Sequence, residues 1–109
     1  VVRERIGGSL KADMTIEEIV KKVSEISSVP EKEIVGKSRK MEIAQARQVS
    51  MFLSREILGK SLSGIGMYFG GRDHTTVMHA IKTISEKVDT DDVISNTISK
   101  LRTDLNQSF

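Results

Sequence analysis

With 109 residues, 38% of them hydrophobic, the chain has the size of one domain around a single core. It contains no cysteine, which excludes a disulfide framework and a thiolate metal site. The formal net charge is only +2, but residues 37–88 hold nine basic and four acidic side chains, a local excess of +5. A basic segment within a chain of low net charge favours a nucleic-acid partner.

The first residues predict a linker followed by two helices. Residues 1–13 show little apolar periodicity and contain Gly-Gly-Ser, so we expect a linker or the end of a helix from an upstream module. Thr15 caps the first helix, and Glu18 completes a capping box with it. This helix runs to about residue 27, and Pro30 opens a second, short one.

The rest of the chain predicts four more helices. A central helix is expected from about Glu42 to Leu58, because its apolar residues are too frequent for one narrow stripe. Ser61 caps a short helix, and Asp73 caps a longer one to about residue 88. Residues 89–92 form a turn and an acidic N-terminus for the last helix. The apolar face of this last helix is expected to contain Val93 or Ile94, with Ile98, Leu101 and Leu105. No strand pattern occurs, so the fold class is all-α with about six helices.

Residues 70–80 predict a helix-turn-helix. Gly70 and Gly71 permit a tight turn between two helices, and the second helix begins with small polar side chains. Its body should face the core through Val77, Ala80, Ile81, Ile84 and Val88. In a helix-turn-helix, the N-terminal residues of the second helix contact base edges in the major groove.

Signals for catalysis or metal binding are lacking. No phosphate-binding loop with a Gly-Lys-Ser/Thr ending occurs. His74 and His79 are five residues apart, ~140° around a helix, so they do not share a face as metal ligands would. Two alternatives to specific DNA binding stay open. One is a small helical protein-interaction module that uses the five methionines. The other is a non-specific DNA binder, from a shortened paralogue of a longer DNA-binding protein.

Residues 65–80, Ile-Gly-Met-Tyr-Phe-Gly-Gly-Arg-Asp-His-Thr-Thr-Val-Met-His-Ala, closely resemble the signature of the DnaA family of bacterial chromosomal replication initiators. Residues 37–40, Lys-Ser-Arg-Lys, resemble the basic loop of that family. Residues 46–49 resemble its Pro-Arg-Gln element and residues 61–63 its Ser-Leu-Pro helix start, each without the proline. Neither departure removes a DNA-contacting side chain.

This resemblance implies that residues 14–109 are the C-terminal DNA-binding domain, with a Trp-repressor-like helix-turn-helix. Such a domain binds double-stranded DNA at DnaA boxes of the replication origin, as one monomer per box, in the cytoplasm at the bacterial nucleoid. ATP and its hydrolysis are expected only on an upstream module, so this chain should need no cofactor and catalyse nothing. The family also contacts acidic phospholipids near the linker, which Arg3-Glu4-Arg5, short and mixed in charge, supports only weakly.

The resemblance also assigns roles by position. Arg39 matches the arginine that enters the narrow minor groove of A·T-rich DNA. The residues that match the major-groove readers are Asp73, His74, Thr75 and Thr76. The residues that match the phosphate-contacting set are Lys37, Lys40, Arg47, Gln48, Arg55, Lys60, Ser61 and Leu62. For His79, a partly buried position and a phosphate contact both stay open.

Overall fold

The computed structural model describes residues 14–107, which form six helices and no strand. In chain order the helices are α2 (Ile16–Ser27), α3 (Glu31–Ile34), α4 (Met41–Leu58), α5 (Leu62–Tyr68), α6 (His74–Thr90) and α7 (Asp92–Gln107). The all-α prediction is therefore confirmed. None of the helices described is both long and apolar enough to cross a bilayer. The predicted linker at residues 1–13 lies outside the described residues.

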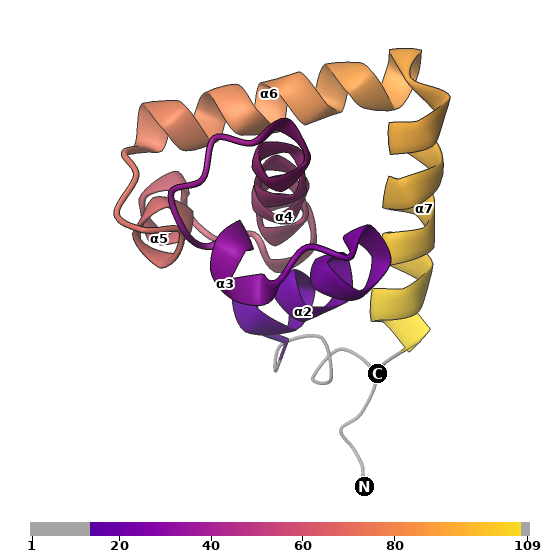
Figure 1. Cartoon of the computed structure of the whole chain (residues 1–109), viewed down its shortest axis with the longest axis horizontal. Helices are drawn as coiled ribbons and strands as arrows, with labels where there is room; N and C mark the ends of the chain where they lie inside the picture. The colour runs from indigo at the N-terminus through magenta and orange to yellow at the C-terminus, as the bar shows by residue number, and fades with distance from the viewer. Residues whose placement is uncertain (1–13, 108–109) are drawn as a thin grey trace, which may run out of the picture.

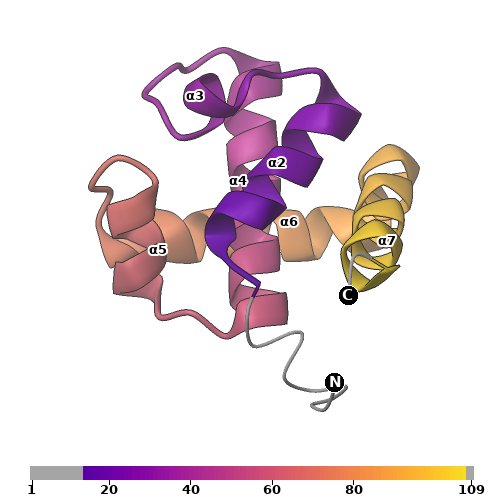
Figure 2. The ribbon, with the colours of Figure 1, turned by 90° about the horizontal axis from the view of Figure 1, so that it is seen from below.

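Helix α4 is the centre of the fold, and α2, α3, α5 and α6 pack against it (Figure 1). Helix α6 crosses α4 on one side, while α2 and α3 cover the other side (Figures 1 and 2). Helix α7 turns away from the C-terminal end of α6 and returns to pack against α2. The largest fully buried side chains come from all six helices or their caps and include Ile19, Ile34, Leu53, Ile65, Phe69, Val77, Ile84, Ile98 and Leu101.

Three of the predicted helix starts are confirmed by their caps. The side chains of Thr15, Ser61 and Asp73 each accept a hydrogen bond from the backbone N–H three residues along, at 3.3, 3.0 and 2.9 Å respectively. These bonds satisfy backbone donors that have no partner within the helix. Local sequence therefore determines where α2, α5 and α6 begin.

Residues 89–92 were predicted to form a turn and the acidic start of the last helix; the acidic start is confirmed at Asp92, but the predicted turn was wrong in length. Helix α6 continues through Asp89 and Thr90, and only Asp91 separates it from α7. The Asp91 carboxylate accepts hydrogen bonds from the N–H groups of Val93 and Ile94, at 3.0 and 3.2 Å, so one residue ends α6 and caps α7. Of the two candidates for the α7 core face, Ile94 is buried, at 4% exposure, and Val93 is not, at 72%.

The turn between α5 and α6 depends on a direct backbone contact at Gly66. The Gly66 carbonyl accepts hydrogen bonds from the N–H groups of Gly71 and Arg72, at 3.0 and 2.9 Å. Gly70 and Gly71 have φ values of +85° and +77°, in the left-handed region that favours glycine. A Cβ atom on Gly66 would lie 2.0 Å from the Arg72 carbonyl oxygen, so no larger residue fits here.

We expect Gly66→Ala to destabilise the domain, because the added methyl group must push the turn away from α5. Overpacking of this kind costs about 1–3 kcal/mol, which lowers Tm by several degrees in a domain of this size. Thermal unfolding followed by circular dichroism checks this. Gly64→Ala in the same helix is the matched control, because there the added Cβ would meet only the Ser61 hydroxyl, at 3.1 Å. Equal Tm values for the two variants would contradict the contact described.

The cap of α6 predicts a response to acid. The backbone N–H of Thr76, together with the Thr76 side chain, holds the pKa of Asp73 below its ordinary value of 3.8. The pKa of the Asp73 carboxyl is lower in the folded state than in the unfolded state, so the carboxylate stabilises the fold above about pH 4. This stabilisation is lost as the pH falls through the pKa of the folded state. Asparagine caps a helix without a charge.

We therefore expect Asp73→Asn to lose less stability than the unaltered chain between pH 5 and pH 2. Urea unfolding midpoints at a series of pH values measure the difference. If both proteins lost stability in parallel over this interval, the Asp73 carboxylate would not be the stabilising cap.

Candidate nucleic-acid interface

The first turn of α6 is presented to solvent while the body of the helix is anchored. Val77 and Ile84 are fully buried beneath α6. The predicted base readers on its outer side, all exposed, are Asp73, His74, Thr75 and Thr76. Because the Asp73 cap fixes the start of the helix, these short polar side chains project from a rigid element rather than from a loop.

The predicted basic loop, residues 37–40, lies beside the helix-turn-helix. In Figure 1 the segment between α3 and α4 runs close to the turn between α5 and α6, with which it lines a common hollow. The side chains of Lys37, Arg39 and Lys40 are exposed. A hollow between the loop and the α5–α6 turn has walls from both, including Lys37, Ser38, Arg39, Gly70, Gly71 and Arg72. Elements more than 30 residues apart in the chain therefore form one surface.

A second hollow continues this surface along α6. It is lined from α4 and α6 by residues that include Arg47, Gln48, Arg72, Thr76, His79 and Thr83. The two hollows share Ala44, Arg47 and Arg72. No carboxylate lines either hollow, so the joined surface suits an anion. His79 is exposed here, on the same side of α6 as Thr76, which decides against the partly buried alternative.

Arg47 occupies a different environment from the one its predicted phosphate contact implies. Its side chain is buried, at 6% exposure, and donates from Nε, Nη1 and Nη2 to the carbonyl oxygens of Ile34, Ser38 and Glu33, at 2.7, 3.0 and 3.1 Å. Burial, and next the charge of Arg72, lower the pKa of Arg47, and Glu33 opposes this shift. Three of the five N–H groups of a guanidinium are thus already used to hold the chain before and within the basic loop. Its contact with phosphate stays a prediction.

The remaining predicted phosphate residues form a separate group at the turn between α4 and α5. Arg55 donates from Nη1 to the Lys60 carbonyl oxygen at 2.8 Å, and the Ser61 hydroxyl caps α5 through the Gly64 N–H. Arg55, Lys60 and Ser61 are exposed, whereas Leu62 is half-buried. None of them lines either of the hollows beside the basic loop.

Arg72 is the residue of this surface that the sequence did not single out. It lines both hollows and donates from Nη2 to the Gly36 carbonyl oxygen at 2.9 Å and from Nη1 to the Phe69 carbonyl oxygen. The available signal was a basic residue placed between the turn glycines and the Asp73 cap. Its partners are set by tertiary structure, so that signal alone could not identify them.

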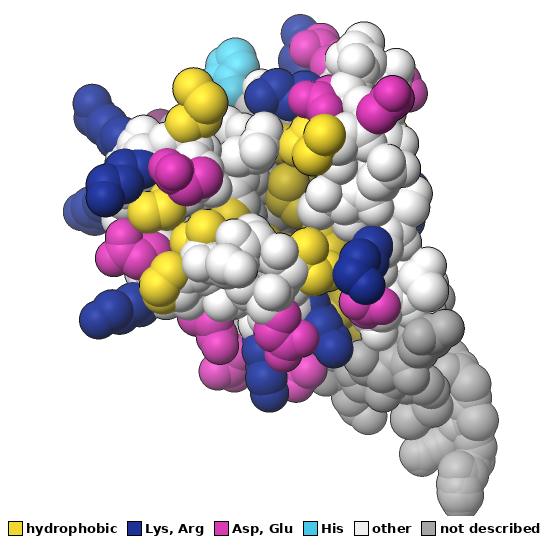
Figure 3. Space-filling model, turned by 45° about the vertical axis from the view of Figure 1, so that its right-hand side comes forward, with side chains coloured by type: hydrophobic (Ala, Val, Ile, Leu, Met, Phe, Trp, Pro, Cys, Tyr) yellow, Lys and Arg dark blue, Asp and Glu magenta, His cyan; other side chains and the backbone are white. Residues whose placement is uncertain are grey.

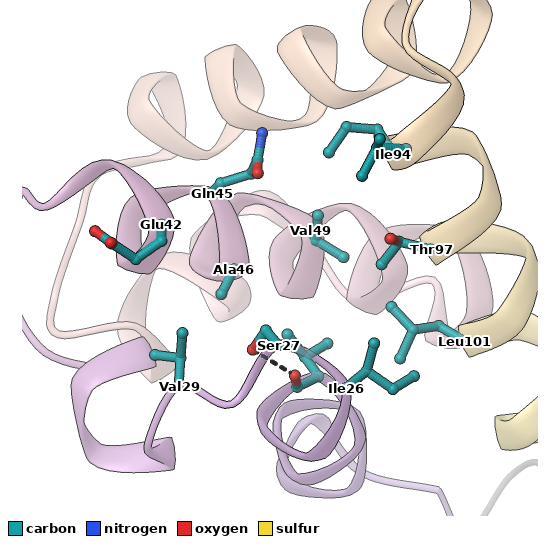
Figure 4. Close-up of a pocket in the computed structure, with 12 residues that line it drawn as sticks. Ile26, Ser27, Val29, Glu42, Gln45, Ala46, Val49, Ile94, Thr97 and Leu101 are labelled. Atoms are coloured by element: carbon teal, nitrogen blue, oxygen red, sulfur yellow. Dashed lines mark hydrogen bonds between the residues drawn. The ribbon is translucent and has the colours of Figure 1, made fainter.

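An apolar groove lies between α2, α4 and α7 (Figures 3 and 4). Its volume is about 210 Å³, and its lining includes Val23, Ile26, Val49, Val93 and Leu101. None of the five methionines lines it: Met14 and Met51 are buried in the core, while Met41, Met67 and Met78 are exposed elsewhere. The methionines therefore do not form this apolar groove. Among the described residues, no three potential metal ligands cluster together.

Comparison with known proteins identifies the family of the chain. A family model described as the bacterial DnaA protein helix-turn-helix matches residues 16–84. The chromosomal replication initiator protein DnaA of Chlorobaculum tepidum is 43% identical over 89 residues, 82% of this chain and 18% of that protein. The protein of the same name from Limosilactobacillus reuteri is 41% identical over 95 residues, 87% of this chain and 22% of that protein.

A solved structure gives the same result for the fold. A crystal structure of a DNA replication initiation factor superimposes with a TM-score of 0.78 at 26% identity, covering 93% of this chain and 31% of that one. The chain spans about a fifth of the length of the curated relatives it matches. The matched region is a helix-turn-helix, a non-catalytic helical domain, and its boundaries include the basic loop, the turn and most of α6. The chain belongs to the bacterial DnaA family and contains its helix-turn-helix domain.

Proposed function

We propose that this chain binds double-stranded DNA at DnaA boxes and serves the initiation of chromosomal replication. The observation that carries the proposal is the surface that joins the exposed basic loop to the exposed first turn of α6 through two hollows, neither of which is lined by a carboxylate. The names of its relatives, which are chromosomal replication initiators, support the replication role. ATP binding and hydrolysis would belong to other parts of such proteins, and one copy of this domain would occupy one box at the nucleoid.

In this proposal the two parts of the surface enter adjacent grooves. The N-terminal turn of α6 lies in the major groove, where a threonine methyl can pack on the thymine methyl group and a hydroxyl can bond a base edge. Arg39 extends from the basic loop into a narrow, electronegative minor groove. Lys37, Lys40 and His79 bind the phosphates between the two grooves, which fixes register without reading sequence.

The turn between α4 and α5 would hold the DNA backbone at a further point. Arg55 and Lys60 supply charge there, while Gln48 lies nearer α6, in the wall that also holds Thr76. Ser61 and the Leu62 backbone lie at the start of α5, where backbone N–H groups point outward. Phosphate contacts at the basic loop and at the turn between α4 and α5 would then hold the DNA at two separate points while α6 lies in the groove.

The charge of the segment limits what non-specific attraction can supply. A net excess of +5 over residues 37–88 is modest for a DNA-binding surface. Each phosphate neutralised makes log K fall by about 0.9 per tenfold rise in salt, so general DNA affinity should be weak near physiological salt. Sequence preference must then come from groove contacts, each worth about 1–3 kcal/mol.

Fluorescence anisotropy tests the proposal directly. A labelled duplex with one DnaA box is compared with a scrambled duplex of the same length, both near physiological salt. We expect binding to the box to be tighter by at least about tenfold, the equivalent of one good base contact. Equal, salt-sensitive binding to both would leave a non-specific basic domain, and binding to neither would favour the interaction-module alternative.

Arg39→Ala should weaken box binding strongly, because it removes the side chain assigned to the minor groove. The expected loss is about tenfold or more, as for other arginines that contact bases. Lys21→Ala removes the same charge from an exposed position on α2 that lines neither hollow, and it should change affinity little. If both variants lost affinity equally, only net charge would matter at residue 39.

Thr76→Ala should reduce discrimination more than affinity for scrambled DNA. The backbone N–H that Asp73 caps is retained, while the hydroxyl and methyl groups assigned to base contact are lost, together with the hydrogen bond from that hydroxyl to Asp73. Thr90→Ala makes the same change near the other end of α6, about 21 Å along the helix axis, and is the control. A Thr76 variant that lost affinity equally for box and scrambled duplexes would not be a base reader.

A further inference from the structure

Arg72 joins the basic loop to the helix-turn-helix through two main-chain carbonyl groups. Its Nη2 donates to Gly36 at 2.9 Å, and its Nη1 donates to Phe69. Gly36 immediately precedes the basic loop, and Phe69 is the C-cap of α5. One planar guanidinium therefore holds two backbone segments that are more than 30 residues apart in the chain.

Arg47 holds the same segment from α4. It donates to the carbonyl oxygens of Glu33, Ile34 and Ser38. With the bond from Arg72 to Gly36, arginine side chains occupy four carbonyl groups between residues 33 and 38. The exposed loop that carries Arg39 is thus fixed by donors from two different helical regions.

The close approach of the two segments is visible at Gly70 as well. A Cβ atom added there would lie 3.3 Å from both the Val35 carbonyl oxygen and Arg72 Nη1. The turn glycine, the chain that enters the basic loop and the Arg72 side chain therefore meet at one point. A shift of the loop relative to α6 would have to break the Arg72 bonds.

We propose that Arg72 is a positioning residue that fixes the basic loop relative to the first turn of α6, so that Arg39 and Thr76 meet adjacent grooves in one docking event. This inference rests on the proposed DNA-binding function. The distance between neighbouring grooves is set by the DNA, so a loop held at the matching distance does not have to be ordered on binding. Without Arg72 the cations of the loop keep their charge, and Arg47 still ties the segment to α4, but the hydrogen-bonded link between the loop and the turn before α6 is lost.

The first test needs no DNA. Backbone ¹⁵N relaxation of Arg72→Ala should give residues 37–40 order parameters below about 0.6, while helical residues of α4 stay near 0.85 as in rigid backbone. Arg55→Ala is the matched control, since it also removes an arginine bond to a backbone carbonyl, at Lys60. An unchanged loop would overturn the proposal, and so would a loss of order spread over the whole domain. If Arg72→Ala does not fold, Arg72→Lys is measured in the same way.

The second test separates positioning from direct phosphate contact. Arg72→Lys keeps the charge but cannot donate in a fork to two carbonyl groups, so it should still bind the box about tenfold more weakly. In a background where Lys37, Arg39 and Lys40 are all alanine, Arg72→Ala should cause no further loss. Arg55→Ala should cause its full loss in that background, because its site is separate.

Two results would contradict the positioning role. Full rescue by Arg72→Lys would mean that the charge alone is needed. A further loss in the alanine-loop background, with the slope of log K against log salt reduced by about 0.9, would mean that Arg72 contacts a phosphate itself. If the unaltered chain did not prefer the box, the proposed function would be refuted instead. The relaxation experiment needs no DNA, so it would still show whether Arg72 orders the loop.

Discussion

The contact between the Gly66 carbonyl and the N–H groups of Gly71 and Arg72 is the constraint on which the binding surface depends. It brings the backbone of the turn against α5, where there is no room for a Cβ atom. The closed turn places Asp73 where it caps α6, and it directs Arg72 toward the chain before the basic loop. One backbone contact therefore determines both the start of α6 and the anchor of the loop beside the turn.

Helix α6 has a buried side that stabilises the fold and an exposed side that is proposed to read DNA. Val77 and Ile84 are removed from water and hold the helix against α4 and α5, whereas Thr76 and His79 remain exposed. Substitution on the outer side can therefore alter recognition without opening the core. The modest charge of residues 37–88 fits this division, because a surface with few cations must rely on where each one is held.

Local features of the fold were predictable from sequence, and tertiary ones were not. The caps at Thr15, Ser61 and Asp73 depend on residues within one turn, so their pattern is readable in the chain. The end of α6 was misjudged, because a cluster of acidic residues predicts a turn, although Asp91 alone can end one helix and cap the next. Arg47 and Arg72 resemble surface cations in sequence, and only packing reveals that both donate to distant carbonyl groups.

The most direct test of the account is to map where DNA contacts the chain. Amide chemical shifts of the ¹⁵N-labelled protein are followed during titration with a duplex that carries one DnaA box. If the proposed interface is right, the largest changes fall on residues 37–40, on residues 73–79 and at the turn between α4 and α5. Changes concentrated on α2 and α7, around the apolar groove, with the basic loop unaffected, would contradict it.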